Sequence, residues 1–338
     1  MSARIADAVA TVGPVTSGVA VAASPETPPH TPRRAVALGL VSSAFFSTTF
    51  IVNRSIGLAG GSWVWTAVLR YAWVLALLGG WFLVRGKLPQ VARAFRRHWL
   101  FWTIAGSIGY GAFYASLSFA STQAPGWIVA CTMQFTILAT PMVLLAFGAR
   151  VRRTGLVLLL LIFAGIVLVN IDHRGESTLA QAWGVLPVLI AAFAYPIGNQ
   201  LVQEGRNGGR GRIPALNDPI TADASARVLL LTLGSVPFWL AVLLVPHPSL
   251  PSSQQLVGTF VVALCGTVIG TSIFLVARQG AGRDPNAIAK VDATQAGYTA
   301  FSLLGEVLIL HAALPGPIGV GGILLVLGGL AAYAATAH

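Results

Sequence analysis

Residues 154–171 read TGLVLLLLIFAGIVLVNI, a stretch without a charged side chain, and Arg150, Arg152 and Arg153 come directly before it. A helix of about 20 apolar residues, at about 1.5 Å per residue, crosses the hydrocarbon core of a bilayer. Basic residues beside such a helix are typical of its cytoplasmic end. This stretch therefore predicts a membrane-spanning helix whose N-terminal end lies at the cytoplasmic face.

The rest of the chain has the same character. Of its 338 residues, 55% are hydrophobic and 9% are charged, whereas a soluble domain is about a quarter charged. Gly, Pro or charged residues separate the apolar stretches. The composition predicts an all-α membrane protein with ten transmembrane helices, at roughly 35–56, 63–84, 99–121, 126–147, 154–171, 180–202, 226–246, 256–277, 286–310 and 316–336.

The basic residues indicate the orientation in the membrane. The net charge of +11 comes from short clusters between spans rather than from one basic face, which argues against nucleic-acid binding. With a cytoplasmic N-terminus, only Arg54 and Arg174 fall on the far side, so the positive-inside rule predicts both termini in the cytoplasm. We expect an integral protein of the cytoplasmic (inner) membrane.

The N-terminal segment, residues 1–32, differs from the rest. It is rich in Ala, Val, Thr, Ser and Pro without a helical period, which predicts a disordered cytoplasmic tail. A cleaved signal peptide that starts around Arg4 is the alternative.

The two halves of the chain resemble each other weakly. Ala105-Gly106-Ser107-Ile108 aligns with Cys265-Gly266-Thr267-Val268, and Ile51-Val52-Asn53 aligns with Ile197-Gly198-Asn199. Similarity at half the chain length is typical of repeat-built transporters. Five spans per half is an odd number, so residues 33–171 and 172–338 are predicted to form two inverted five-helix repeats with a binding site between them.

One face of the predicted ninth helix is polar. A charge in mid-membrane costs about 2.5–3.5 kcal/mol on insertion scales, so polar positions there need an explanation. At about 100° per residue, one arc of about 80° holds five of them: Asp292, Gln295, Thr299, Ser302 and Glu306. The functional interpretation is a cavity wall, and the alternative is hydrogen bonding between packed helices.

Other spans add candidate site residues. Arg70 in the second span is expected to pair with Glu306, or else to extend outward to the headgroups. Thr49 and Asn53 in the first span have Tyr195 and Asn199 as repeat mates, which suggests two matching cavity walls, or helix capping instead. Aromatic or amide groups at mid-depth are candidates for cargo contact or for simple packing: Gln134 and Tyr110.

The motifs argue against an enzyme and predict no cofactor. H-E-x-x-H, G-x-S-x-G and G-x-x-x-x-G-K are absent, and Cys131 and Cys265 lie in apolar stretches, so no metal site or disulfide is expected. Without a nucleotide-binding motif, an ion gradient or simple exchange is left to drive transport. A proton is the simplest choice, because burial favours the protonated form of a carboxyl group such as Glu306 or Asp292.

Several short motifs resemble a known family: Phe50-Ile51-Val52-Asn53-Arg54, Leu69-Arg70-Tyr71, Tyr195-Pro196-Ile197-Gly198-Asn199-Gln200, Asp292-Ala293-Thr294-Gln295 and Gly305-Glu306. The chain resembles the drug/metabolite transporter superfamily, EamA-like branch, and is most similar to its multidrug resistance efflux transporter family. Phe147-Gly148-Ala149-Arg150 replaces the Gly-Glu that often closes the fourth helix there, which argues against a mechanism with two matched glutamates.

The resemblance implies a secondary active transporter that exports a drug-like compound or metabolite by alternating access. Its expected partners are a small-molecule substrate, membrane lipid and a proton, with a homodimer left open. A non-catalytic channel or a membrane-embedded enzyme remains the alternative.

Overall fold

The computed structural model describes residues 32–148, 156–172, 178–244, 248–281 and 290–336, so the predicted tail lies outside the described residues. Within these ranges the regular structure is helical apart from one isolated bridge between Arg210 and Ile213. The all-helical prediction is confirmed. Six helical segments are long and apolar enough to cross a membrane, namely Arg33–Leu58, Trp63–Val84, Gly126–Ala146, Trp183–Arg206, Ala224–Leu244 and Ser253–Arg278.

The other four predicted spans are not among these six long apolar helices. Leu160–Asp172 and Pro317–Ala332 are shorter apolar helices. The third predicted span, 99–121, is helical but carries many Ser, Thr, Tyr and Gly residues, which lower its hydropathy. The ninth, 286–310, is described from residue 290 onward. The count of ten spans therefore stays a prediction.

The helices of the first half begin and end near the predicted breaks. They are α2 (Pro32–Leu58), α3 (Trp63–Val84), α4 (Leu88–Arg97), α5 (Trp99–Gly106), the π-helical η1 (Ser107–Ala112), α6 (Phe113–Gln123), α7 (Gly126–Met133), α8 (Thr136–Ala146) and α9 (Leu156–Asp172).

The second half contains a comparable series. It consists of α10 (Thr178–Arg206), the 3₁₀-helical η3 (Pro219–Ala222), α11 (Ala224–Leu244), α12 (Ser253–Val262), the π-helical η4 (Ala263–Gly270), α13 (Thr271–Gly280), the 3₁₀-helical η5 (Thr294–Ala296), α15 (Gly297–Ile309) and α16 (Pro317–Thr336).

Helix α4 was not predicted, because residues 85–98 were interpreted as a loop. It is short and amphipathic, with Val91 and Ala94 buried and basic residues in its last turn. Arg97 lies 3.7 Å from the carboxylate of Asp218, which links this connection to the one before η3. Such a partly exposed ion pair contributes little to stability, so the buried apolar residues hold α4 in place.

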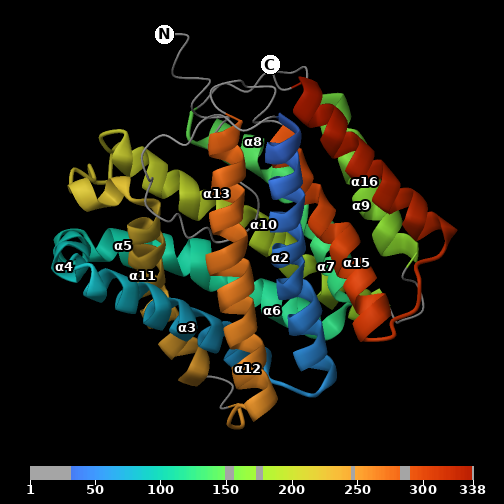
Figure 1. Cartoon of the computed structure of the whole chain (residues 1–338), viewed down its shortest axis with the longest axis horizontal. Helices are drawn as coiled ribbons and strands as arrows, with labels where there is room; N and C mark the ends of the chain where they lie inside the picture. Colours follow the sequence, from blue (N-terminus) through green and yellow to red (C-terminus); the bar gives the residue numbers. More distant parts are fainter. Residues whose placement is uncertain (1–31, 149–155, 173–177, 245–247, 282–289, 337–338) are drawn as a thin grey trace.

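The two halves pack into each other rather than side by side (Figure 1). Helix α2 lies against η4, α13 and α15, while α10 lies against η1, α6 and α8. Helices α9 and α16 pair along one edge of the molecule. Glycines allow the closest approaches: a Cβ atom on Gly109 of η1 would lie 2.9 Å from Cα of Gly198 of α10. Small residues at such crossings let helix backbones touch.

Candidate functional site

The polar stripe predicted on the ninth span lies inside the protein. Gln295, Thr299, Ser302 and Glu306 are at most 3% exposed, while the Asp292 side chain is 25% exposed. Helix α15 packs against α2 and α7, so the stripe faces protein rather than lipid. Ser302 donates to the carbonyl oxygen of Tyr298 at 2.6 Å, within its own helix.

Glu306 is bound at the start of α7. Its Oε1 accepts a hydrogen bond from the backbone N–H of Gly126 at 2.5 Å. The first N–H groups of a helix have no partner within it and attract negative charge. Glycine is required at this position, because a Cβ atom on Gly126 would lie 2.6 Å from the carbonyl oxygen of Phe50.

The cation that acts on Glu306 is Arg54 rather than Arg70. The Arg54 guanidinium interacts electrostatically with Glu306, and it donates to the carbonyl oxygens of Ser121 at 3.4 Å and Thr122 at 3.2 Å. These carbonyls lie at the end of α6, where the helix dipole favours a cation. Arg54 therefore contacts the end of α6 and acts electrostatically on Glu306, which is the role expected of Arg70.

Arg70 lies in the protein interior, with 3% of its surface exposed, so it does not extend outward to the headgroups. Its Nη2 donates to the hydroxyl of Thr267 in η4 at 3.3 Å, and its guanidinium lies 4.1 Å from the ring centre of Tyr114 in α6. Asn53 of α2 donates its amide N–H to the Tyr114 hydroxyl at 3.0 Å. Two predicted residues, Arg70 and Asn53, are thus joined through a tyrosine.

An aromatic stack continues from this point. The ring of Tyr71 stacks on Tyr110 and on Trp239, with 5.4 Å between ring centres in each pair, and meets Tyr114 edge-on at 5.7 Å. We call the following set the Arg70 centre: Arg70, Tyr71, Tyr110, Tyr114, Trp239 and Thr267. Its members come from α3, η1, α6, α11 and η4, so both halves of the chain contribute.

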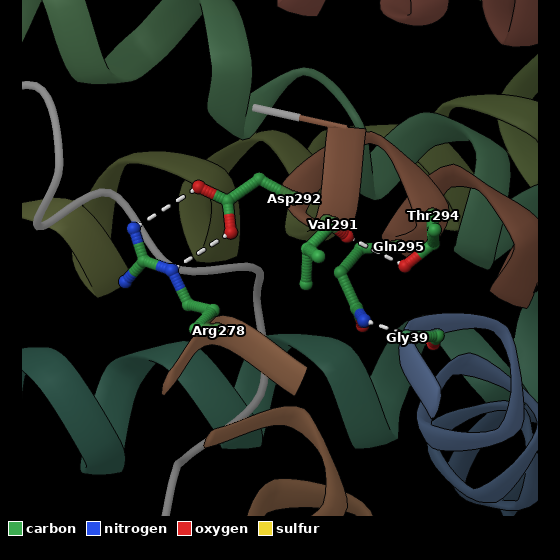
Figure 2. Close-up of polar contacts among 6 residues, drawn as sticks. All are labelled: Gly39, Arg278, Val291, Asp292, Thr294 and Gln295. Atoms are coloured by element: carbon green, nitrogen blue, oxygen red, sulfur yellow. Dashed lines mark hydrogen bonds and ion pairs between the residues drawn. The ribbon is translucent and has the colours of Figure 1, made fainter. Parts of the chain in front are cut away.

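Asp292 forms a separate ion pair with Arg278 of α13 (Figure 2), with 3.0 Å between Oδ1 and Nε. The adjacent Gln295 donates to the carbonyl oxygen of Gly39 in α2 at 3.4 Å. Gln134, between α7 and α8, donates to the hydroxyl of Thr299 at 3.4 Å. These contacts connect the stripe to the first half of the chain.

The repeat-related candidates do not have matching environments. Thr49 is 5% exposed and lies close to Gly266 of η4, since a Cβ atom there would lie 2.9 Å from its hydroxyl. Tyr195 is buried against Phe113, with 5.2 Å between ring centres. Asn199, however, is exposed, whereas its repeat mate Asn53 is buried.

Several residues of these clusters are not among the predicted site residues, including Arg54, Tyr71, Trp239 and Thr267. Arg54 and Tyr71 do stand in the family-like motifs beside Asn53 and Arg70, and Thr267 stands in the internal repeat. Their neighbours in the sequence were a usable signal, whereas nothing around Trp239 indicated a role. Among the described residues, no group of three or more His, Cys, Asp or Glu side chains could hold a metal ion.

Long apolar helices, a polar interior and the pairing of the two halves define a helical integral membrane protein. Residues 33–338 match the family model described as "EmrE: Putative multidrug resistance efflux transporter", and the chain belongs to this family of membrane transporters.

Individual relatives match this chain over most of its length. "Uncharacterized protein YjlA" of Bacillus subtilis (strain 168) is 33% identical over an alignment of 313 positions, which covers 88% of this chain and 93% of that protein. An "Uncharacterized 42.1 kDa protein in intracellular alkaline protease 3'region" of Shouchella clausii is 31% identical, over 78% of this chain and 70% of that protein. A solved structure described as "Crystal structure of protein" covers 90% of this chain and 97% of its own at 18% identity with a TM-score of 0.54, which shows a shared fold.

Proposed function

We propose that the protein is a secondary active transporter that exports a small molecule across the cytoplasmic membrane by alternating access. In this proposal ten spans form two inverted five-helix repeats, residues 33–171 and 172–338, with both termini in the cytoplasm and the cargo between the halves. The matching partners of equivalent helices support it, since α2 packs on η4 and α13 as α10 packs on η1 and α6. Inverted repeats of this kind move against each other around a central site.

Proton coupling through Glu306 is the second part of the proposal. The observation that carries it is the contact between the buried Glu306 carboxylate of α15, in the second half, and the Gly126 N–H of α7, in the first half. Protonation of the carboxylate removes the charge that the start of α7 and Arg54 attract. The contact between the halves would then weaken, which is what a coupled rocking motion requires.

The direct test uses everted membrane vesicles from cells with and without the protein. Uptake of cationic dyes, aromatic carboxylates, amino acids and sugars is measured with and without an imposed proton gradient. We expect gradient-dependent accumulation of at least one class, abolished by a protonophore. Accumulation of none of them above the control vesicles would contradict proton-driven export.

A further inference from the structure

We propose that the outer face of helix α4 and its two flanks bind the phosphate headgroups of anionic phospholipids in the cytoplasmic leaflet. We call the following set the α4 basic face: Trp81, Arg85, Arg93, Arg96, Arg97 and Trp99. This inference does not depend on transport. It takes only the side of the membrane from the proposed topology, in which the end of α3 is cytoplasmic.

The first step concerns charge. No acidic residue stands between Glu26 and Asp172, whereas twelve of the 21 Lys and Arg residues of the chain do, five of them within residues 85–97. Among the described residues, Arg97 is the one cation of these five with a carboxylate within 4 Å, that of Asp218 at 3.7 Å. Anions from outside the described part of the protein therefore balance the rest of this charge.

The second step concerns direction. Val91 and Ala94 are buried, so their side of α4 faces the protein. At about 100° per residue, the arginines of this helix fall on an arc of about 100° on the opposite side. These three side chains are all exposed: Arg93, Arg96 and Arg97. The positive charge of α4 therefore points away from the core.

The third step concerns depth in the membrane. Trp81 in the last turn of α3 and Trp99 at the start of α5 are both exposed, and so are the apolar Val84 and Leu100 beside them. Tryptophan is enriched where the hydrocarbon core meets the headgroups. The Arg85 guanidinium lies 4.1 Å from the ring centre of Trp81, so charge and ring occupy the same level. The α4 basic face thus lies at headgroup depth.

The fourth step concerns the partner. Guanidinium groups bind phosphate oxygens through two parallel hydrogen bonds, and exposed tryptophan and apolar side chains favour lipid over a soluble phosphate compound. Basic residues next to a membrane segment attract anionic lipid, each with about a fivefold gain in affinity. Helix α4 also contacts η3 and α11 of the second half and lies at one edge of the molecule (Figure 1). Lipid bound there should stabilise the folded chain, because it binds the native state.

Thermal unfolding of the full chain in a neutral detergent, after removal of lipid, tests the inference. The probes are dioctanoyl phosphatidylglycerol, dioctanoyl phosphatidylcholine and glycerol 3-phosphate, which carries the phosphate without acyl chains. The rise of Tm with probe concentration gives each affinity. We expect phosphatidylglycerol to bind at least about fivefold more tightly than phosphatidylcholine, and this preference to shrink when the salt concentration is raised from about 0.05 M to about 0.5 M.

Two results overturn the inference at this stage. Equal affinity for the two lipids would show that the α4 basic face is a solvated surface without a lipid partner. Protection by glycerol 3-phosphate at the concentrations at which phosphatidylglycerol protects would assign the face to soluble phosphate compounds instead.

Variants locate the preference. Arg93→Gln/Arg96→Gln should lower it to about twofold or less and should fold normally, because both side chains are exposed. The matched control is Arg206→Gln/Arg212→Gln, which removes the same charge from exposed positions on the same side of the membrane in the proposed topology, with no tryptophan nearby in the sequence. The control should keep the preference. An equal loss in both variants contradicts the assignment, since net charge alone would then set the preference.

A fluorescence measurement decides the matter without any change in α4. The full chain is reconstituted in phosphatidylcholine vesicles that contain about a tenth of brominated phosphatidylglycerol or of brominated phosphatidylcholine, and the signal of Trp99 is the difference between the parent and Trp99→Phe. Trp99 should be quenched more strongly by the brominated anionic lipid, because that lipid is enriched at the α4 basic face. Equal quenching by the two lipids overturns the inference. Proton-driven uptake in everted vesicles is a separate measurement, so its failure would reject transport and leave the lipid site standing.

Discussion

Replacement of Glu306 by glutamine is the sharpest perturbation of the proposed mechanism. The amide oxygen of the new side chain can still accept the Gly126 N–H, so the 2.5 Å contact keeps its geometry but loses its charge. Hydrogen bonds to charged groups contribute about 1.5–3 kcal/mol and neutral ones about 0.5–1.5 kcal/mol, so Glu306→Gln should destabilise the fold by about 1 kcal/mol. Glu306→Ala also leaves the N–H unsatisfied and should cost about 2–4 kcal/mol.

The assay combines thermal unfolding in detergent with the vesicle uptake measurement. Glu306→Gln should insert and unfold almost like the parent, while proton-driven uptake falls to the level of control vesicles and loses its pH dependence. Asp292→Asn is the competing variant and should retain uptake, because Asp292 is paired with Arg278 away from the interface with α7. Parental uptake by Glu306→Gln with an unchanged pH profile would refute the coupling role. Loss of expression would instead indicate that the Glu306 carboxylate is needed for folding.

Three further predictions follow from single contacts or from topology. A reporter fused after His338 should be cytoplasmic, and periplasmic exposure would contradict ten spans with both termini in the cytoplasm. Gly126→Ala should destabilise the fold by about 1–3 kcal/mol through overpacking against the Phe50 carbonyl and the Glu306 carboxylate; Gly79→Ala, whose Cβ meets nothing within 4 Å, should be neutral or stabilising in the same thermal unfolding assay. A double-mutant cycle of Arg278→Gln and Asp292→Asn should give a coupling energy of about 1 kcal/mol or less, because both side chains are partly exposed; a much larger value would show that this pair holds the structure together.

The sequence was informative where the cause is local. The chain breaks between Leu58 and Trp63 and again at Pro125, as predicted. Gly60 takes a left-handed backbone conformation (φ 76°) after the first helix, and Pro125 has no N–H to continue α6. The buried stripe of α15 was also readable, since a polar arc in a lipid-spanning helix must face protein. Helix α4 was missed because its amphipathic pattern covers too few residues to stand out.

The contacts between side chains of different helices could not be predicted from the sequence in this way. Arg70 and Arg54 are both buried or half-buried arginines in the first half, and depth along the membrane normal does not distinguish them as partners of Glu306. The answer depends on which helices adjoin α15, and it is α2, which carries Arg54, that packs along it. Contacts of this kind are set by helix packing rather than by any one sequence motif.

The same packing places Arg70 and Glu306, which were expected to form one ion pair, in two separate environments. Glu306 and Arg54 lie where the end of α6, the start of α7 and α15 meet, so they contact backbone groups at two helix ends. Arg70 instead meets rings and hydroxyl groups from both halves inside the packed core. If each charge has its own partners, a variant at one should leave the other's equilibrium nearly intact, because distant sites with no shared partner are close to additive. Arg70→Gln should therefore leave the pH dependence of uptake unchanged, whereas Glu306→Gln should remove it.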